Sequence, residues 1–238
     1  MSFLEIAIAS LTMFVGSTVQ GSIGFGMGLL ASPILILIDE RFVPAPILLS
    51  SWVLTTFLIL RERQAIDLVG LRWAVAGRVA GTSVAGIVLA VLPQDRVTVV
   101  FGGLVLIGVA MSVSGLQLTP RRWVLVGAGT LSAVMGTIAS IGGPPMALVY
   151  QHAHGARLRA TMSSFFWIGT VMSLVTLRLV GRFGAAEVRL TLVILPAMVA
   201  GLVLSKWTAT RVDRGYTRPL VLALAAAAGL AVILRELL

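Results

Sequence analysis

Long apolar stretches separated by short polar links run through the whole chain. Ten stretches are recognisable, at about residues 3–21, 25–38, 43–60, 73–92, 97–118, 123–140, 142–151, 160–177, 188–207 and 219–234. An apolar run of about 18 or more residues has the length that crosses a bilayer as a helix. The pattern predicts an all-α polytopic membrane protein with eight to ten transmembrane segments.

The amino-acid composition is typical of a protein embedded in the lipid bilayer. Of the 238 residues, 58% are apolar and only 11% are charged, whereas a soluble domain carries about 25% charged residues. The net charge of +9 comes from basic residues scattered singly between apolar segments, without the basic run that nucleic-acid binding needs. The absence of cysteine excludes disulfides and thiolate metal sites. We expect no nucleic-acid partner, no metal and no cofactor.

Weak internal matches suggest that the chain is duplicated. Met135-Gly136-Thr137-Ile138 is similar to Gln20-Gly21-Ser22-Ile23 at an offset of 115, Leu177-Arg178 matches Leu60-Arg61 at 117, and Asp213-Arg214 matches Asp95-Arg96 at 118. Three matches at nearly one offset favour two repeats, residues 1–120 and 121–238, that together form one membrane domain. An odd number of crossings in each repeat would place the repeats in opposite orientations.

The second apolar segment of each repeat is short. These segments, at about 25–38 and 142–151, are too short for a hydrocarbon core of about 30 Å if they are straight helices. Each one either spans or pairs with the preceding segment as a re-entrant hairpin, and the inverted orientation holds in both cases.

A glycine-rich cluster interrupts the apolar sequence of each repeat. The first runs from Gly21 to Gly28, with Pro33 after it, and the second from Ser140 to Pro145. Glycine costs about 1 kcal/mol and proline about 3 kcal/mol in a helix interior, so both clusters predict helix breaks. In lipid, such breaks persist only where they are buried in protein or line a wet cavity, and a matched pair is typical of a transporter's binding site. The alternative is close helix packing through small residues.

The predicted breaks have the chemistry of an anion site. N–H groups at the start of a half-helix attract anions, and glycine lets a solute approach the backbone closely. We predict a site for a small anionic substrate made of Gln20, Ser22, Gly24, Gly26, Gly28, Thr137, Ser140, Gly142, Gly143, Pro144 and Pro145. For each hydroxyl side chain, a hydrogen bond to its own helix backbone is the alternative.

Arg78 is the only basic residue well inside an apolar segment. An intramembrane charge is by default a functional candidate, here as a partner for the anion. However, Arg78 follows Trp73, the expected first residue of its segment, by only five positions. A side chain at this depth reaches the interface by snorkelling, which is the interpretation the sequence favours.

With these features the chain resembles the sulfite exporter TauE/SafE family, also called the TSUP family. That family is duplicated, and each half carries a Gly-x-Gly-Gly-Gly stretch followed by proline. Here the copies are Gly24-Phe25-Gly26-Met27-Gly28 with Pro33, and Ser140-Ile141-Gly142-Gly143-Pro144-Pro145. Met27, Ser140 and Pro144 replace glycines, and Val149 replaces the later proline. The resemblance implies a secondary transporter in the bacterial inner membrane, a permease or exporter of sulfite, sulfonates or sulfoacetate-like anions.

Two other function classes stay open as alternatives. A membrane-embedded enzyme, for example an acyltransferase, would need a general base deep in its site, and only His152 or His154 is a candidate. Common catalytic motifs are absent from the sequence, so an enzyme is not expected. An anion channel differs from a transporter in its flux, which neither saturates nor depends on a counter-ion.

The basic residues predict the orientation of the chain. Eleven Lys and Arg residues fall on the side that contains residues 61–72, 118–122, 152–159 and 206–218, and six fall on the other side. Because Lys and Arg concentrate in cytoplasmic loops, we place these four loops in the cytoplasm and both termini outside.

Cysteine labelling tests this orientation. We expect an impermeant maleimide to leave Gln64→Cys unmodified in intact cells and to modify Ser2→Cys, since the two positions are predicted on opposite sides. The wild-type chain has no cysteine and supplies the blank. Labelling of Gln64→Cys from outside would show that the orientation is reversed.

Overall fold

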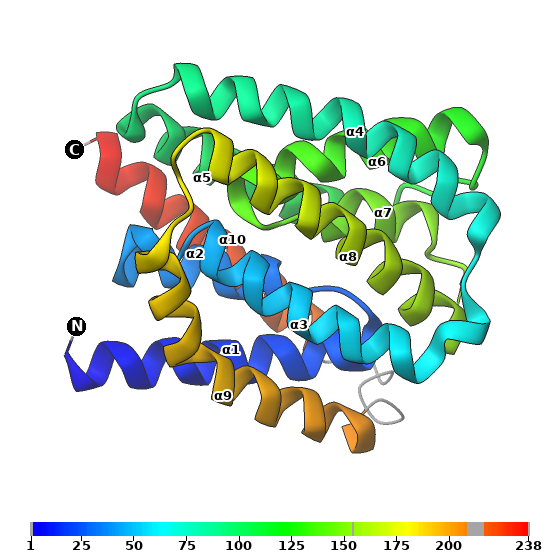
Figure 1. The fold of residues 1–238 in the computed structure, drawn as a ribbon, viewed down its shortest axis with the longest axis horizontal. Helices are drawn as coiled ribbons and strands as arrows, with labels where there is room; N and C mark the ends of the chain where they lie inside the picture. The colour runs from blue at the N-terminus through cyan, green and yellow to red at the C-terminus, as the bar shows by residue number, and fades with distance from the viewer. Residues whose placement is uncertain (1, 154, 209–216, 238) are drawn as a thin grey trace.

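The computed structural model describes residues 2–153, 155–208 and 217–237. Within these residues the chain forms ten α-helices and no strand (Figure 1). The helices are α1 (Phe3–Ile23), α2 (Met27–Ile38), α3 (Ala45–Glu62), α4 (Leu68–Val91), α5 (Gln94–Val113), α6 (Arg122–Ala139), α7 (Gly143–Val149), α8 (Gly155–Leu179), α9 (Ala185–Thr208) and α10 (Thr217–Leu237). Two short 3-10 helices, Glu40–Phe42 and Arg63–Ala65, stand at the two ends of α3. The prediction of an all-α polytopic membrane protein is confirmed.

The helices differ in whether they are long enough to cross a membrane. In the described part of the chain, seven are long and apolar enough, namely α1, α3, α4, α5, α6, α8 and α9. By contrast, α2 has 12 residues and α7 has 7, against the roughly 20 that a spanning helix needs. These two are half-helices packed against α1 and α6, and the choice between spanning and re-entrant segments stays a prediction. With 21 residues, α10 has the length of an eighth crossing.

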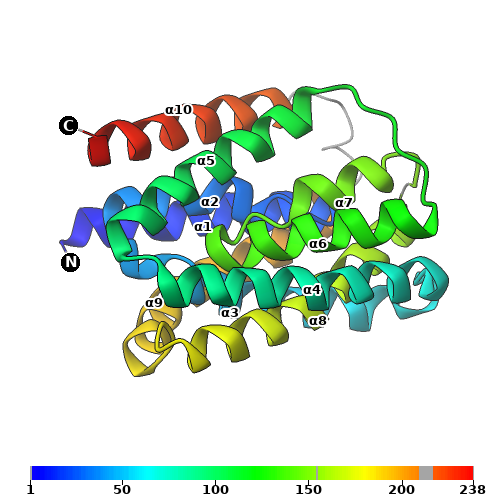
Figure 2. The same cartoon turned by 90° about the horizontal axis from the view of Figure 1, so that it is seen from above.

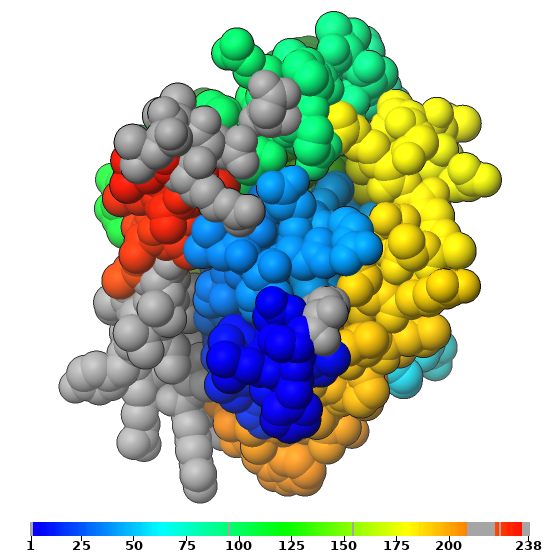
Figure 3. Space-filling model, turned by 90° about the vertical axis from the view of Figure 1, so that its left-hand side faces the viewer, coloured from blue at the N-terminus to red at the C-terminus, as the bar shows by residue number. Residues whose placement is uncertain are grey.

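The two ends of the bundle carry different links. Helix α1 begins and α10 ends at one end, on the left of Figure 1, and the links α3–α4, α5–α6 and α7–α8 lie at the other. Figure 3 looks onto the first end and shows the α2–α3 region, in light blue, near its centre beside the yellow α8–α9 link. Three of the four loops that we grouped as basic thus share one end. The fourth falls mainly on residues 209–216, outside the described residues, and the choice of cytoplasmic side stays a prediction.

Close packing through glycine joins helices from different halves. Helix α4 lies along α6, as Figure 2 shows, and α1 lies along α9. A Cβ atom at Gly77 of α4 would overlap the carbonyl oxygen of Val126, and one at Gly201 of α9 would overlap that of Phe14. Thr130 Oγ1 also donates to the carbonyl of Gly77 at 3.0 Å. Small residues allow this approach in membranes, where helices gain little from the hydrophobic effect.

The two halves repeat one pattern of elements. Each begins with a long helix, a break and a half-helix, and each long helix packs on the fourth helix of the other half, α1 on α9 and α6 on α4. Helix α1 ends at Gly24 with φ 94° and α6 ends at Ser140 with φ 60°, both left-handed and 140 − 24 = 116 positions apart. The division into two repeats, residues 1–120 and 121–238, and their inverted relation stay predictions.

Helix α4 begins five residues earlier than its apolar pattern predicts. The expected start was Trp73, after a charged loop, but Asp67 is the N-cap and its Oδ1 accepts the N–H of Gly70 at 3.1 Å. An aspartate at this position satisfies a helix donor that would otherwise lack a partner. The earlier start draws Arg72 into the helix and places Arg78 further from the helix end.

Two glycines of α6 make a matched test of the α4–α6 contact. Gly129→Ala would put a Cβ against the carbonyl of Ala74, whereas Gly127 has nothing within 4 Å. Overpacking costs about 1–3 kcal/mol, but alanine in open space is about 1 kcal/mol better than glycine in a helix. We expect Gly129→Ala to lower the melting temperature in detergent and Gly127→Ala to leave it unchanged or raise it. Equal melting temperatures would contradict the close packing.

Candidate functional site

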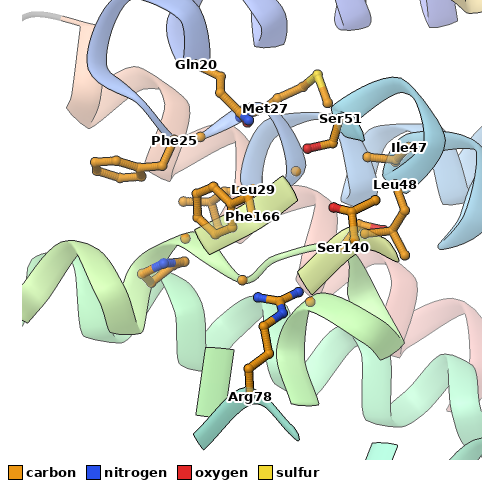
Figure 4. Close-up of a pocket in the computed structure, with 17 residues that line it drawn as sticks. Gln20, Phe25, Met27, Leu29, Ile47, Leu48, Ser51, Arg78, Ser140 and Phe166 are labelled. Carbon is orange, nitrogen blue, oxygen red and sulfur yellow. The ribbon is translucent and has the colours of Figure 1, made fainter. Parts of the chain in front are cut away.

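A small cavity lies where the two helix breaks meet (Figure 4). Its volume is about 40 Å³, the space of a few water molecules at about 10–15 Å³ each. Both halves of the chain contribute to its walls. The lining residues are Gln20, Phe25, Gly26, Met27, Gly28, Leu29, Ile47, Leu48, Ser51, Arg78, Gly136, Ser140, Gly142, Gly143, Pro144, Phe166 and Thr170.

Glycine brings the two breaks into direct contact. A Cβ at Gly28 would overlap the carbonyl oxygen of Ser140, and a Cβ at Gly143 would stand 3.2 Å from the ring of Phe25. Gly26, between these contacts, has φ 117°, a backbone conformation that residues other than glycine rarely adopt. Segments more than 100 residues apart in sequence therefore touch through their backbones, and the cavity forms beside this contact.

Eight of the twelve residues that the sequence proposed for the site line this cavity. They are Gln20, Gly26, Gly28, Arg78, Ser140, Gly142, Gly143 and Pro144. The other four lie outside it. Ser22 Oγ donates to the carbonyl of Thr18 in its own helix at 2.7 Å, Thr137 Oγ1 bonds Ser173 Oγ at 2.7 Å, Gly24 packs against Arg159, and Pro145 is buried in α7. For Ser22, the alternative of a bond to the helix backbone is what the structure shows.

Two polar lining residues hold the breaks in shape. Gln20 Oε1 accepts the N–H of Met27 at 3.2 Å and so caps α2, whose first N–H groups have no partner within the helix. Ser140 Oγ donates to the carbonyl of Pro44 at 3.0 Å and ties the second break to the α2–α3 link. Each side chain keeps capacity for a ligand, since the Gln20 amide still has N–H donors and the Ser140 hydroxyl can accept.

Arg78 is buried beside the cavity and does not snorkel. The residue is 2% exposed, and its guanidinium points from α4 toward the two breaks in Figure 4. Its Cζ lies 4.8 Å from the centre of the Phe165 ring, and Gly169 of α8 packs directly against it. Arg78 stands at the eleventh position of α4, which begins at Leu68. The snorkelling interpretation is wrong because it assumed a start at Trp73.

The guanidinium of Arg78 lacks a counter-charge in the described part of the chain. Its Nε and Nη1 have no hydrogen-bond partner there, and no carboxylate lines the cavity. Arginine stays protonated in proteins, so its positive charge is buried. Beside it stands the start of α2, where Gly28 and Leu29 line the cavity within the positive end of the helix dipole. The site is therefore cationic and has unused donors.

The sequence gives no sign that α3 and α8 contribute to the cavity. Ser51, Phe166 and Thr170 line it but stand in uninterrupted helices, where neither composition nor spacing distinguishes them from other residues. Trp167 of α8 also stacks on Trp52 of α3, with ring centres 6.2 Å apart. This contact fixes the two helices that close the cavity wall.

The sequence also gives no sign of a partly buried ion pair near the first break. Arg159 of α8 donates to Glu62 of α3 through three hydrogen bonds of 2.6–3.0 Å, with the side chains 15% and 8% exposed. Arg159 Nη1 also reaches the carbonyl of Ser22 at 3.5 Å. The sequence placed Glu62 and Arg159 in polar loops, yet the pair joins α1, α3 and α8.

Groups expected of an enzyme or a metal site are not gathered at the cavity. Among the described residues, no group of three or more His, Asp or Glu side chains could hold a metal ion. His152, a candidate base of the enzyme alternative, is exposed in the α7–α8 link, and His154 lies outside the described residues.

The fold and the cavity define a class of protein, a helical membrane protein with a small cationic cavity between two broken helices. The chain belongs to the Sulfite exporter TauE/SafE family, whose model matches residues 8–232. The match covers both breaks and all residues that line the cavity, so the resemblance drawn from the glycine clusters is confirmed. No curated protein and no solved structure matches the chain.

The Arg159–Glu62 pair gives a stability prediction. We expect Glu62→Gln to destabilise the protein by about 1.5–3 kcal/mol, because it removes charge-assisted hydrogen bonds from the partly buried Arg159. The double variant Glu62→Gln/Arg159→Gln also removes the unpaired guanidinium and should recover part of the lost free energy of unfolding. Arg41→Gln is the matched control, since it breaks the exposed Arg41–Asp39 pair, worth about 1 kcal/mol or less. Denaturant unfolding in detergent measures wild type and the three variants, and equal losses for Glu62→Gln and Arg41→Gln would contradict a larger contribution from the partly buried pair.

Proposed function

We propose that the protein is a secondary transporter of a small anion, which binds in the cavity between the two helix breaks. The observation that carries this proposal is Arg78, a buried guanidinium beside a solute-sized cavity with no carboxylate on its walls. Membership of the sulfite exporter family supports an oxyanion of sulfur as the substrate class. Sulfite and small sulfonates are the first candidates.

A bound anion supplies the negative counter-charge that Arg78 lacks among the described residues. A buried cation without a partner is costly, and an anion in the cavity offsets this cost through charge-assisted hydrogen bonds. The planar guanidinium matches two oxygens of an oxyanion, and the N–H groups at the start of α2 are further donors. The small volume of about 40 Å³ favours compact anions over bulky ones.

Transport by alternating access requires contacts on each side of the site that open in turn. Two sets of contacts join the elements around the breaks. Arg159 links Glu62 and the Ser22 carbonyl on one side, and Ser140 holds the carbonyl of Pro44 on the other. We assign these contacts to the opposite gates, with the two predicted inverted repeats moving against each other about the anion.

Flux through proteoliposomes with Arg78 variants tests the proposal. We expect Arg78→Gln to lower sulfite transport at least tenfold and Arg78→Lys to keep a part of it, because lysine keeps the charge but not the planar fork. Arg63→Gln, which removes an exposed arginine, is the matched control and should transport as wild type. Saturable flux distinguishes a transporter from a channel.

The proposal fails if Arg78→Gln, folded and reconstituted in equal amount, transports all tested anions at the wild-type rate. Wild-type protein that moves none of sulfite, sulfate, taurine or sulfoacetate would overturn the substrate class. Thermal shift with the same four compounds gives a second readout, because a ligand that binds only the folded protein raises its stability by RT ln(1 + [L]/Kd).

A further inference from the structure

A second basic site lies on the outside of the bundle, at the end where α4 and α6 begin. There a groove of about 180 Å³ is lined by residues that include Asp67, Arg72, Trp73, Pro120 and Arg122. It is separate from the cavity at the breaks, since the two share no lining residue. The proposed transport function makes no use of it.

Trp73 holds two arginines in place. The guanidinium carbon of Arg72 lies 5.3 Å from the centre of the Trp73 rings, and that of Arg122 lies 5.5 Å from it. Cation–π contacts of this length orient a guanidinium without neutralising it. Neither arginine has an ion pair among the described residues. Two exposed positive groups therefore flank one aromatic side chain and keep their donors free.

The start of α6 adds to the positive potential. Its N-cap is Arg121, which provides no side-chain hydrogen bond to the first turn. The N–H groups of that turn have no partner within the helix and carry the positive end of the dipole. Arg121 is itself exposed, next to Arg122. A helix start beside three arginines is a strong site for a phosphate group.

Asp67, the one acidic residue that lines the groove, already has hydrogen-bond and ion-pair partners. Asp67 Oδ1 accepts the N–H of Gly70 at 3.1 Å, and Oδ2 lies 3.7 Å from Arg157 and 3.4 Å from the Tyr150 hydroxyl. Burial raises the pKa of Tyr150, so the phenol stays protonated and donates to Asp67. The carboxylate is thus engaged by Gly70, Tyr150 and Arg157 and forms no ion pair with Arg72 or Arg122.

Exposed apolar side chains surround the groove. Trp123 is 83% exposed beside Arg122, and Leu68 and Val69 at the start of α4 are more than 60% exposed. Further along α4, the exposed side chains are again apolar, including Ile87 and Val91. Exposed tryptophan and arginine at the end of an apolar helix surface are typical of the level of lipid headgroups.

We propose that this groove binds the headgroup phosphate of an anionic phospholipid, with the acyl chains along the exposed face of α4 and α6. Charge selects the class of lipid. Arg72, Arg121 and Arg122 would repel the ammonium group of a zwitterionic headgroup and attract an anionic one. The apolar surface that continues from the groove favours a membrane lipid over a phosphate compound from solution.

Native mass spectrometry of the purified full-length protein tests this assignment by titration with phosphatidylglycerol and phosphatidylcholine. We expect wild type to retain phosphatidylglycerol in preference to phosphatidylcholine, and R72Q/R122Q to lose roughly 30-fold in affinity for it. Each interfacial arginine contributes about 1 kcal/mol, and about 1.4 kcal/mol is tenfold. The control R63Q/R178Q removes two exposed arginines outside the groove and should bind as wild type.

Three results would overturn the assignment. Equal affinity of wild type and R72Q/R122Q for phosphatidylglycerol places lipid binding elsewhere. Equal retention of both lipids by wild type means that the groove holds boundary lipid without charge selection. Displacement of phosphatidylglycerol by millimolar inorganic phosphate assigns the site to a soluble anion. If R72Q/R122Q is not monodisperse, R122Q alone is expected to lose about fivefold, and wild-type affinity in that variant counts against the site.

Discussion

One buried positive charge sets the chemistry of the cavity between the helix breaks. Arg78 stands in the middle of a membrane helix, 2% exposed, with only aromatic and backbone contacts from α8. Charges at this depth are costly, and proteins keep them at functional positions. An internal carboxylate would satisfy Arg78 permanently. The cavity walls contain none, and under the proposed function an anion from solution would supply this interaction.

Glycine has two separate roles around this charge. At Gly77, Gly129 and Gly201 it lets helices from opposite halves pack backbone to backbone. At Gly26 and Gly28 it lets a break turn and lie against the second break. The first role builds a scaffold of long helices, and the second leaves a cavity inside it. At Gly28, close packing against the Ser140 carbonyl and a place in the cavity wall occur together.

Much of the fold follows from the sequence, and less of the site does. The lengths of the apolar stretches predict the ten helices, and the glycine clusters at Gly26 and Gly142 predict the breaks. Both follow from local sequence, since the length of an apolar stretch and the free-energy cost of glycine in a helix depend on neighbouring residues only. The depth of Arg78 was misjudged, since it depends on Asp67 capping a turn that looked like a loop. Ser51, Phe166 and Thr170 reach the cavity only through packing of α3 and α8. The Arg159–Glu62 pair likewise joins residues 97 positions apart, and no periodicity reports such a contact.

The most direct measurement is anomalous diffraction from crystals grown with selenite, an oxyanion with the shape and charge of sulfite. The account predicts a selenium peak in the cavity between the two breaks, with a selenite oxygen within about 4 Å of an Arg78 nitrogen, the limit of an ion pair. Crystals of Arg78→Gln should lack this peak. An ordered selenium peak elsewhere would contradict the central claim. So would a cavity that stays empty of anion at saturating selenite, with Arg78 still packed on Phe165.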